Sequence, residues 1–154
     1  MEIAETVSKM SYAKRLQVGA IVVKDNRIIS IGYNGTPAGW DNNCESKEWM
    51  PEGCLHSDEY PEEEYSDYGN DIFIGRYKLK TKPEVIHAEA NAIMKLASSN
   101  ETGKGSVMFL THAPCMECAK LIYGAGITKV FFKNEYRDRT GIEFLNKSID
   151  IVQL

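Results

Sequence analysis

The stretch Val107-Met108-Phe109-Leu110-Thr111-His112-Ala113-Pro114-Cys115-Met116-Glu117-Cys118 contains an apolar run, a proline and then two cysteines three positions apart. The apolar run predicts a strand, and the residues from Cys115 to Tyr123 predict a helix that starts near the proline. Residues three apart project from the same face of a helix, so the two thiols can hold one metal ion. We therefore expect a strand and a helix joined by a turn, with two thiolate ligands at the helix start.

A second segment supplies the remaining ligand. His87-Ala88-Glu89 lies in the first turn of a helix predicted from Val85 to Ala97. One imidazole and two thiolates, from His87, Cys115 and Cys118, leave a fourth tetrahedral position for water, which is typical of catalytic zinc. Zinc lowers the pKa of bound water from roughly 15.7 toward about 7. Glu89 is placed to move protons, and the combined pattern predicts a hydrolytic deaminase that acts on a nucleobase.

Neither half of this pattern is specific by itself. An isolated Cys-x-x-Cys pair also occurs in redox proteins and in structural zinc sites. The proline before the first cysteine, the strand predicted before each helix and the spacing from Glu89 to Pro114 together favour the catalytic interpretation.

The rest of the chain alternates between strand and helix patterns. We expect an α/β fold, a three-layer α/β/α sandwich around a central mixed sheet of about five strands, in a single domain over residues 1–154. The predicted strands are 18–23, 27–33, 107–110, 127–132 and 149–152, and the predicted helices are 2–14, 85–97, 115–123 and 141–147.

Composition favours a soluble protein of the cytoplasm. The first five residues show no basic leader, and no apolar run approaches the roughly 18 residues of a membrane span. Two of the four cysteines are predicted metal ligands, which requires reduced thiols and argues against secretion.

Charge is unevenly distributed along the chain. Ten acidic residues and one basic residue, Lys47, lie between Asn42 and Asp71, so the net charge of −4 leaves the remainder at +5. Little periodicity and many turn formers predict a structureless acidic loop insert at about 40–83. The acidic total argues against a polynucleotide partner.

The chain also resembles a known family. Gly32-Tyr33-Asn34-Gly35-Thr36-Pro37-Ala38-Gly39 is similar to the G-Y-N-G-[S/T/M]-P segment of deoxycytidylate deaminases, and Ile86 to Ile93 and Ala125 to Val130 look like the same family. The resemblance runs from about Lys14 to the carboxyl end, apart from the insert. It implies a cytidine deaminase-like fold and the conversion of dCMP and water into dUMP and ammonia.

The resemblance implies further roles for individual residues. Asn34 would hydrogen-bond the sugar, although asparagine at a strand end is also common for local reasons. The backbone N–H of Ala88 would hold the base carbonyl. Arg15, Arg137 and Tyr136 are the candidates for the 5′-phosphate, although a single arginine is often only a surface charge.

Members of this family are often hexamers activated by dCTP and inhibited by dTTP with Mg²⁺. The resemblance therefore implies a homo-oligomer and a second nucleotide site, whose candidate residues are Gly32, Tyr33, Asn34 and Gly35. The alternative for this segment is a tight turn after a strand. A second, structural zinc in the insert stays open, with Cys44, Cys54 and His56 as its candidate ligands.

Other functions compete with dCMP deamination. Within the superfamily these are deaminases of cytidine, cytosine, guanine or tRNA adenosine. Outside it they are a non-catalytic zinc module that binds dNTPs and a thioredoxin-like redox module.

Overall fold

The computed structural model describes residues 1–66 and 72–154; Gly69 and Asp71 of the predicted insert lie outside these ranges. Its centre is a five-stranded sheet in the order β2-β1-β6-β7-β8. The strands are β1 (Gly19–Lys24), β2 (Arg27–Tyr33), β6 (Val107–His112), β7 (Lys129–Asn134) and β8 (Asp150–Gln153). β1 pairs antiparallel with β2 and β6, whereas β6, β7 and β8 are parallel. The sheet is therefore mixed, as predicted.

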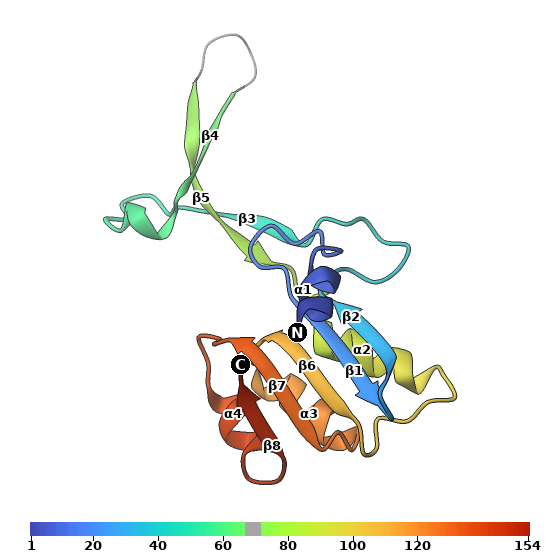
Figure 1. The fold of residues 1–154 in the computed structure, drawn as a ribbon. Coiled ribbons are helices and arrows are strands. Elements are labelled where there is room, and N and C mark those ends of the chain that lie inside the picture. Colours follow the sequence, from blue (N-terminus) through green and yellow to red (C-terminus); the bar gives the residue numbers. More distant parts are fainter. Residues whose placement is uncertain (67–71) are drawn as a thin grey trace.

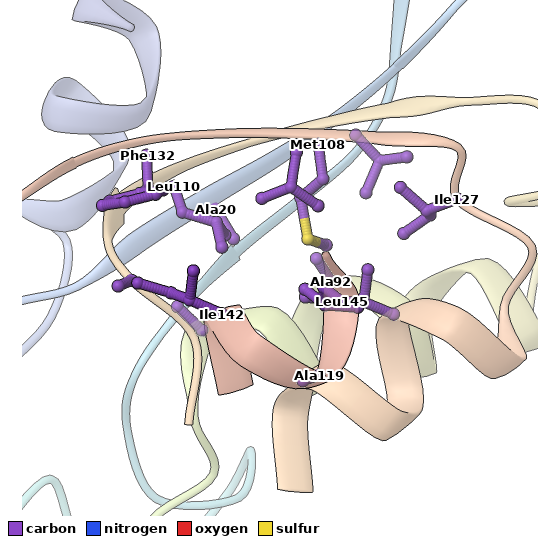
Figure 2. Packing of buried hydrophobic residues seen from close by; sticks show 14 of the residues in the cluster. Ala20, Ala92, Met108, Leu110, Ala119, Ile127, Phe132, Ile142 and Leu145 are labelled. Atoms are coloured by element: carbon purple, nitrogen blue, oxygen red, sulfur yellow. The ribbon is translucent and has the colours of Figure 1, made fainter. Parts of the chain in front are cut away.

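Helices cover both faces of this sheet (Figure 1). They are α1 (Glu2–Ser8), α2 (Ala88–Ala97), α3 (Met116–Gly124) and α4 (Thr140–Leu145). Because side chains alternate along a strand, Met108 and Leu110 pack toward α2, α3 and α4, and Phe109 packs toward α1. The larger buried cluster lies on the first of these faces (Figure 2). The predicted three-layer arrangement is confirmed.

Two predicted helices start or end elsewhere. The first ends at Ser8 rather than near residue 14, because the chain turns toward the end of β2, where the Ser11 hydroxyl donates to the Asn34 carbonyl at 2.7 Å. α2 begins at Ala88 rather than Val85, because the backbone of Ile86 pairs with that of Gly35 in an isolated bridge. The residues before both zinc-ligand helices are thus extended.

The acidic insert is not a structureless loop. It forms a three-stranded antiparallel sheet in the order β3-β5-β4, from β3 (Glu45–Trp49), β4 (Glu62–Tyr65) and β5 (Phe73–Thr81), with a short 3-10 helix at Ser57–Glu59. We call this sheet the arm, because it projects from the body of the molecule (Figure 1). Three of its acidic side chains, Glu48, Glu63 and Glu64, pair with lysines and an arginine across the strands, as Glu48 does with Lys78 at 3.0 Å. This pairing across strands was invisible to a count of charges along the sequence.

In the described ranges, no helix combines the length and the apolar character that a membrane crossing demands.

Candidate metal centre and active site

Two helix starts meet at one point of the structure. His87 is the N-cap of α2, with φ −68° and ψ 153°, and Cys115 is the N-cap of α3, with φ −71° and ψ 170°. Cys118 lies in the first turn of α3 and is buried. His87 Nδ1 is 3.6 Å from Cys115 Sγ and 3.5 Å from Cys118 Sγ.

These three donor atoms fit a zinc ion. Zinc bonds of about 2.0 Å to nitrogen and about 2.3 Å to sulfur, at a tetrahedral angle, place N and S about 3.5 Å apart. The three atoms also lie within 4.8 Å of one another, and no other group of three potential ligands is found in the part of the chain that the structure describes. The ligand set predicted from the sequence therefore converges without rearrangement.

Proton affinities within the trio are strongly perturbed. Hydrogen bonds with Cys118 and His87 hold the pKa of Cys115 down at about 3, and the hydrogen bond with Cys115 raises the pKa of His87. The contact with Cys115, together with burial, raises the pKa of Cys118. Zinc binds thiolates and neutral imidazole, so its binding competes with protons at these three side chains.

Glu89 lies in the first turn of α2 and is 4% exposed. Burial is the largest cause that raises its pKa from 4.5 to about 7. A carboxyl group with a pKa near the working pH can both accept and return a proton. Glu89 thus has the location and the proton affinity that a general acid-base requires.

Two glycines hold the starts of α2 and α3 in place. A Cβ on Gly32 of β2 would lie 2.1 Å from the Ala88 carbonyl oxygen, and a Cβ on Gly141 of α4 would lie 2.1 Å from the Pro114 carbonyl oxygen. Both positions therefore require glycine for close packing. At Gly32 this packing role differs from the place in a second nucleotide site that the resemblance implied, since Gly32 is buried against α2.

A cavity of about 280 Å³ opens over the metal-ligating residues. Most of the residues that sequence reasoning selected contribute to its wall: Arg15, Asn34, His87, Ala88, Glu89, Cys115, Tyr136 and Arg137. Cys118 is buried and is not one of the lining residues. The cavity can hold one small molecule beside the metal site, with two arginines in reach.

Comparison with known proteins agrees with this geometry. Residues 1–134 match the family model described as the cytidine and deoxycytidylate deaminase zinc-binding region. The chain belongs to the cytidine and deoxycytidylate deaminase family. The deoxycytidylate deaminase of Enterobacteria phage T4 is 35% identical over 150 residues, covering 88% of this chain and 76% of the phage protein. The deoxycytidylate deaminase of Homo sapiens is 38% identical over 141 residues, covering 90% of this chain and 65% of the human protein.

A solved structure extends the likeness to the fold. The dCMP deaminase from the cyanophage S-TIM5, crystallised in complex with dCMP and dUMP, has a TM-score of 0.76 and 36% sequence identity. The alignment covers 99% of this chain and 92% of that chain. The prediction of a zinc-dependent deaminase of this family is confirmed.

Three polar residues of the deaminase cavity were missed at the sequence level: Glu45, Thr81 and His112. The first two come from the base of the arm, where no strand was predicted. His112 was visible beside the zinc segment but its spacing gave it no role; in the structure its Nδ1 lies 3.1 Å from the Thr111 hydroxyl, and burial lowers its pKa. His112 is therefore a neutral imidazole in the cavity wall.

Asn34 already has local partners in this deaminase. Its Oδ1 accepts the Val18 N–H at 2.7 Å, and its Nδ2 donates to the Leu16 carbonyl at 2.9 Å. One amide hydrogen and one lone pair stay available for a ligand. Asn34 thus fixes the segment between α1 and β1, whatever contact it makes in the cavity.

The two arginines in the cavity wall come from segments that are far apart in the sequence. Arg15 belongs to the segment between α1 and β1, and its Nη1 donates to the Thr81 hydroxyl at 2.9 Å. Arg137 lies in the loop between β7 and α4, with its guanidinium 5.7 Å from the centre of the Tyr136 ring. The fold therefore brings together the three residues selected as phosphate candidates.

A second cavity of about 210 Å³ lies beside the first. Tyr33, Asn34 and Gly35 contribute to its wall, whereas Gly32 does not. Lys95 of α2 is also in this wall and lies over the Tyr33 ring at 5.5 Å. Asn34 contributes to both cavities, so the two are direct neighbours.

The insert provides no second metal cluster within the described residues. Cys44 is buried in a small cluster with Ala13 and Val85, while His56 is exposed. Cys44, Cys54 and His56 do not meet as a ligand group. Burial raises the pKa of Cys44, which further disfavours its thiolate.

Proposed function

We propose that this deaminase converts dCMP and water into dUMP and ammonia. The convergence of His87, Cys115 and Cys118 beside a buried Glu89 carries the reaction type. Two arginines in the same cavity favour an anionic substrate, and the relatives named above are deoxycytidylate deaminases. We therefore favour a pyrimidine 5′-monophosphate over the free nucleoside or base.

The residues of the cavity divide the chemical work. Zinc held by His87, Cys115 and Cys118 would supply an activated water at neutral pH. Glu89 accepts one proton of that water and transfers it to the ring nitrogen beside the attacked carbon. It then accepts the second proton, from the hydroxyl group added to that carbon, and transfers it to the departing amine, which leaves as ammonia. The backbone N–H of Ala88, the first residue of α2, has no partner within its own helix and is available to the base carbonyl.

The other end of the nucleotide meets polar side chains. Arg15 and Arg137 are positioned to bind the 5′-phosphate through charge-assisted hydrogen bonds, with Tyr136 beside them. Asn34 keeps one donor and one acceptor for the sugar. These assignments follow from the cavity wall and from the chemistry of each side chain.

Ammonia release from a panel of substrates tests this function. We expect zinc-loaded protein to act on dCMP and to act far less on deoxycytidine, cytidine, cytosine and guanine, because only a nucleotide engages the arginines. Glu89→Gln should retain the metal and lose at least about a hundredfold in kcat, the lower limit of a general acid-base contribution. A Glu89→Gln protein with nearly normal turnover would exclude Glu89 from the proton transfers.

Regulation by a second nucleotide is also part of the proposal. The second cavity offers Lys95 and the backbone of the Tyr33–Gly35 segment, and it shares Asn34 with the active site. We propose that dCTP activates and dTTP inhibits there, with Mg²⁺ on the triphosphate. Sigmoidal dCMP kinetics that dCTP makes hyperbolic support this, while hyperbolic kinetics unchanged by dCTP contradict it.

The working form of the protein completes the proposal. We propose that residues 1–154 act as one catalytic unit in a cytoplasmic homo-oligomer, with six copies as in many family members, and without a polynucleotide or membrane partner. Light scattering of the purified protein, with and without dCTP, measures the number of copies.

A further inference from the structure

Glu45, the first residue of β3, is a buried carboxylate in the wall of the active-site cavity. It is 5% exposed, and among the residues that the structure describes only Glu45 and Glu89 are buried acidic side chains. Burying a carboxylate is unfavourable unless it is hydrogen-bonded. Its partners therefore indicate what it does.

One carboxylate oxygen has a structural role. Oε1 accepts the backbone N–H of Lys14 at 3.0 Å and that of Arg15 at 3.2 Å. Thr81 of β5 is the direct pairing partner of Glu45 of β3. The Thr81 hydroxyl accepts a hydrogen bond from the Arg15 guanidinium. The base of the arm thus fixes both the backbone and the side chain of the phosphate candidate.

The other oxygen has no such partner. No residue in the described ranges hydrogen-bonds or forms an ion pair with Oε2 of Glu45. In the same ranges, the Ser66 hydroxyl is the only side-chain nitrogen or oxygen that is fully buried and has no hydrogen-bond partner. Oε2 of Glu45, which also has no partner, is therefore not fully buried. Oε2 is therefore accessible, and because Glu45 lines the cavity, we infer that it opens into the cavity.

Chemistry restricts what Oε2 can meet there. A carboxylate accepts hydrogen bonds, so its partner must be a donor. It repels a phosphate, which the neighbouring Arg15 attracts. The proposed substrate dCMP has two hydrogen-bond donor groups, the amino group attached to the cytosine ring and the 3′-hydroxyl of the deoxyribose. The amino group must face Glu89 and the metal ligands for the reaction to occur.

We propose that Oε2 of Glu45 accepts a hydrogen bond from the 3′-hydroxyl of the substrate sugar. This inference rests on the proposed function. Glu45 then has two connected roles, since one oxygen holds Arg15 in position for the phosphate and the other recognises the sugar hydroxyl on the same nucleotide. The specificity for a nucleotide with a free 3′-hydroxyl originates in the arm.

The test compares dCMP with 2′,3′-dideoxycytidine 5′-monophosphate, which lacks only the 3′-hydroxyl. Hydrogen bonds to charged groups correspond to a preference of about 10- to 100-fold, so we expect wild-type kcat/KM to favour dCMP by that factor. In Glu45→Ala the ratio of the two kcat/KM values should fall toward 1, and any preference that remains is the part that Asn34 contributes. Glu48→Gln, a change on the exposed surface of the same strand, should preserve the wild-type ratio.

A second variant covers the case in which Glu45→Ala does not fold. Glu45→Gln keeps an oxygen for the Lys14 and Arg15 N–H groups and weakens the acceptor at the cavity, because neutral hydrogen bonds are roughly half as strong as charged ones. Its dCMP preference should fall by about 3- to 10-fold. The activity on the dideoxy substrate should change less than the activity on dCMP.

Three results would overturn the proposal, and they have different meanings. If both substrates lose activity by the same factor in the Glu45 variants, Glu45 only supports Arg15. If the wild-type protein does not distinguish the two substrates, no residue reads the 3′-hydroxyl. If zinc-loaded wild-type protein releases no ammonia from dCMP, the proposed function itself fails, and the sugar contact fails with it.

Discussion

Adding a single methyl group at Gly32 should disable the metal centre. In Gly32→Ala the new Cβ would lie 2.1 Å from the Ala88 carbonyl oxygen and 2.6 Å from the Ala92 nitrogen, both backbone atoms of α2. Ordinary contact begins at 3.4 Å, so the start of α2 must move away from β2 by about 1.3 Å. His87 and Glu89 move with it, because they lie at that end of the helix.

Two magnitudes follow from this displacement. Overpacking a well-packed core generally costs about 1–3 kcal/mol, and a displacement of about 1 Å at reacting groups lowers the rate about a hundredfold. We therefore expect Gly32→Ala to lower the free energy of unfolding by at least about 1 kcal/mol. We also expect it to lower kcat/KM for dCMP by about two orders of magnitude. Zinc content per chain measures the damage to the metal centre, urea unfolding measures the loss of stability, and ammonia release measures the loss of activity.

The chain offers a matched control three residues away. A Cβ on Gly35 would meet nothing within 4 Å, so Gly35→Ala should retain zinc, stability and activity without effector. If Gly32→Ala behaved like Gly35→Ala in all three measurements, α2 would not be held against β2 as described. Glycine at position 32 would then have no part in placing the zinc ligand.

Three further predictions concern separate parts of the molecule. In protein stripped of zinc, the raised pKa of Glu89 means that the folded state holds a proton that the unfolded state loses above 4.5, so the contribution of Glu89 to stability falls as the pH rises toward about 7, whereas the lowered pKa of Cys115 acts in the opposite direction; the Glu89 contribution corresponds to roughly 3 kcal/mol, so in urea unfolding the change in stability from pH 5 to pH 8 should be less favourable in the wild type than in Glu89→Gln by up to that amount, and an equal change in both proteins would contradict the raised pKa. Asn34→Ala removes the hydrogen bonds to Val18 and Leu16, so we expect a loss of about 1–3 kcal/mol in thermal unfolding and a higher KM for dCMP; unchanged values of both would contradict these contacts. Leu145→Ala opens a cavity at a fully buried side chain of α4, so urea unfolding should show a loss of about 2–5 kcal/mol with kcat/KM nearly unchanged at 25 °C; equal stability would mean that the core relaxes to fill the space.

Sequence reasoning succeeded where the signal was local. The apolar runs of β1, β2, β6 and β7 and the spacing of Cys115 and Cys118 are properties of short segments, and each is reproduced in the structure. The short polar segment between the predicted strands 18–23 and 27–33 is another local signal, because Asp25 and Asn26 adopt the positive φ values that a tight hairpin turn requires.

It failed where a structure depends on partners far away in the chain. The strand β3 has three charged residues and a single apolar one, Trp49, and it is stabilised by pairing with β5 some thirty residues later. Glu45 gave no signal for the same reason: one oxygen of its carboxylate, Oε1, accepts hydrogen bonds from the N–H groups of residues 14 and 15. The packing of Gly32 against α2 likewise appears only once the helix is placed on the sheet.

The arm also sets a limit on how far this enzyme can be made smaller. β4 pairs with residues 73–77 of β5, so a shorter turn could replace these two segments without touching the body. Its two root residues, Glu45 and Thr81, are part of the catalytic chamber, and a truncation that crossed them would remove a section of wall. A shortened protein must therefore keep Glu45 at the start of β3 and Thr81 at the end of β5, and connect the two strands outside the cavity.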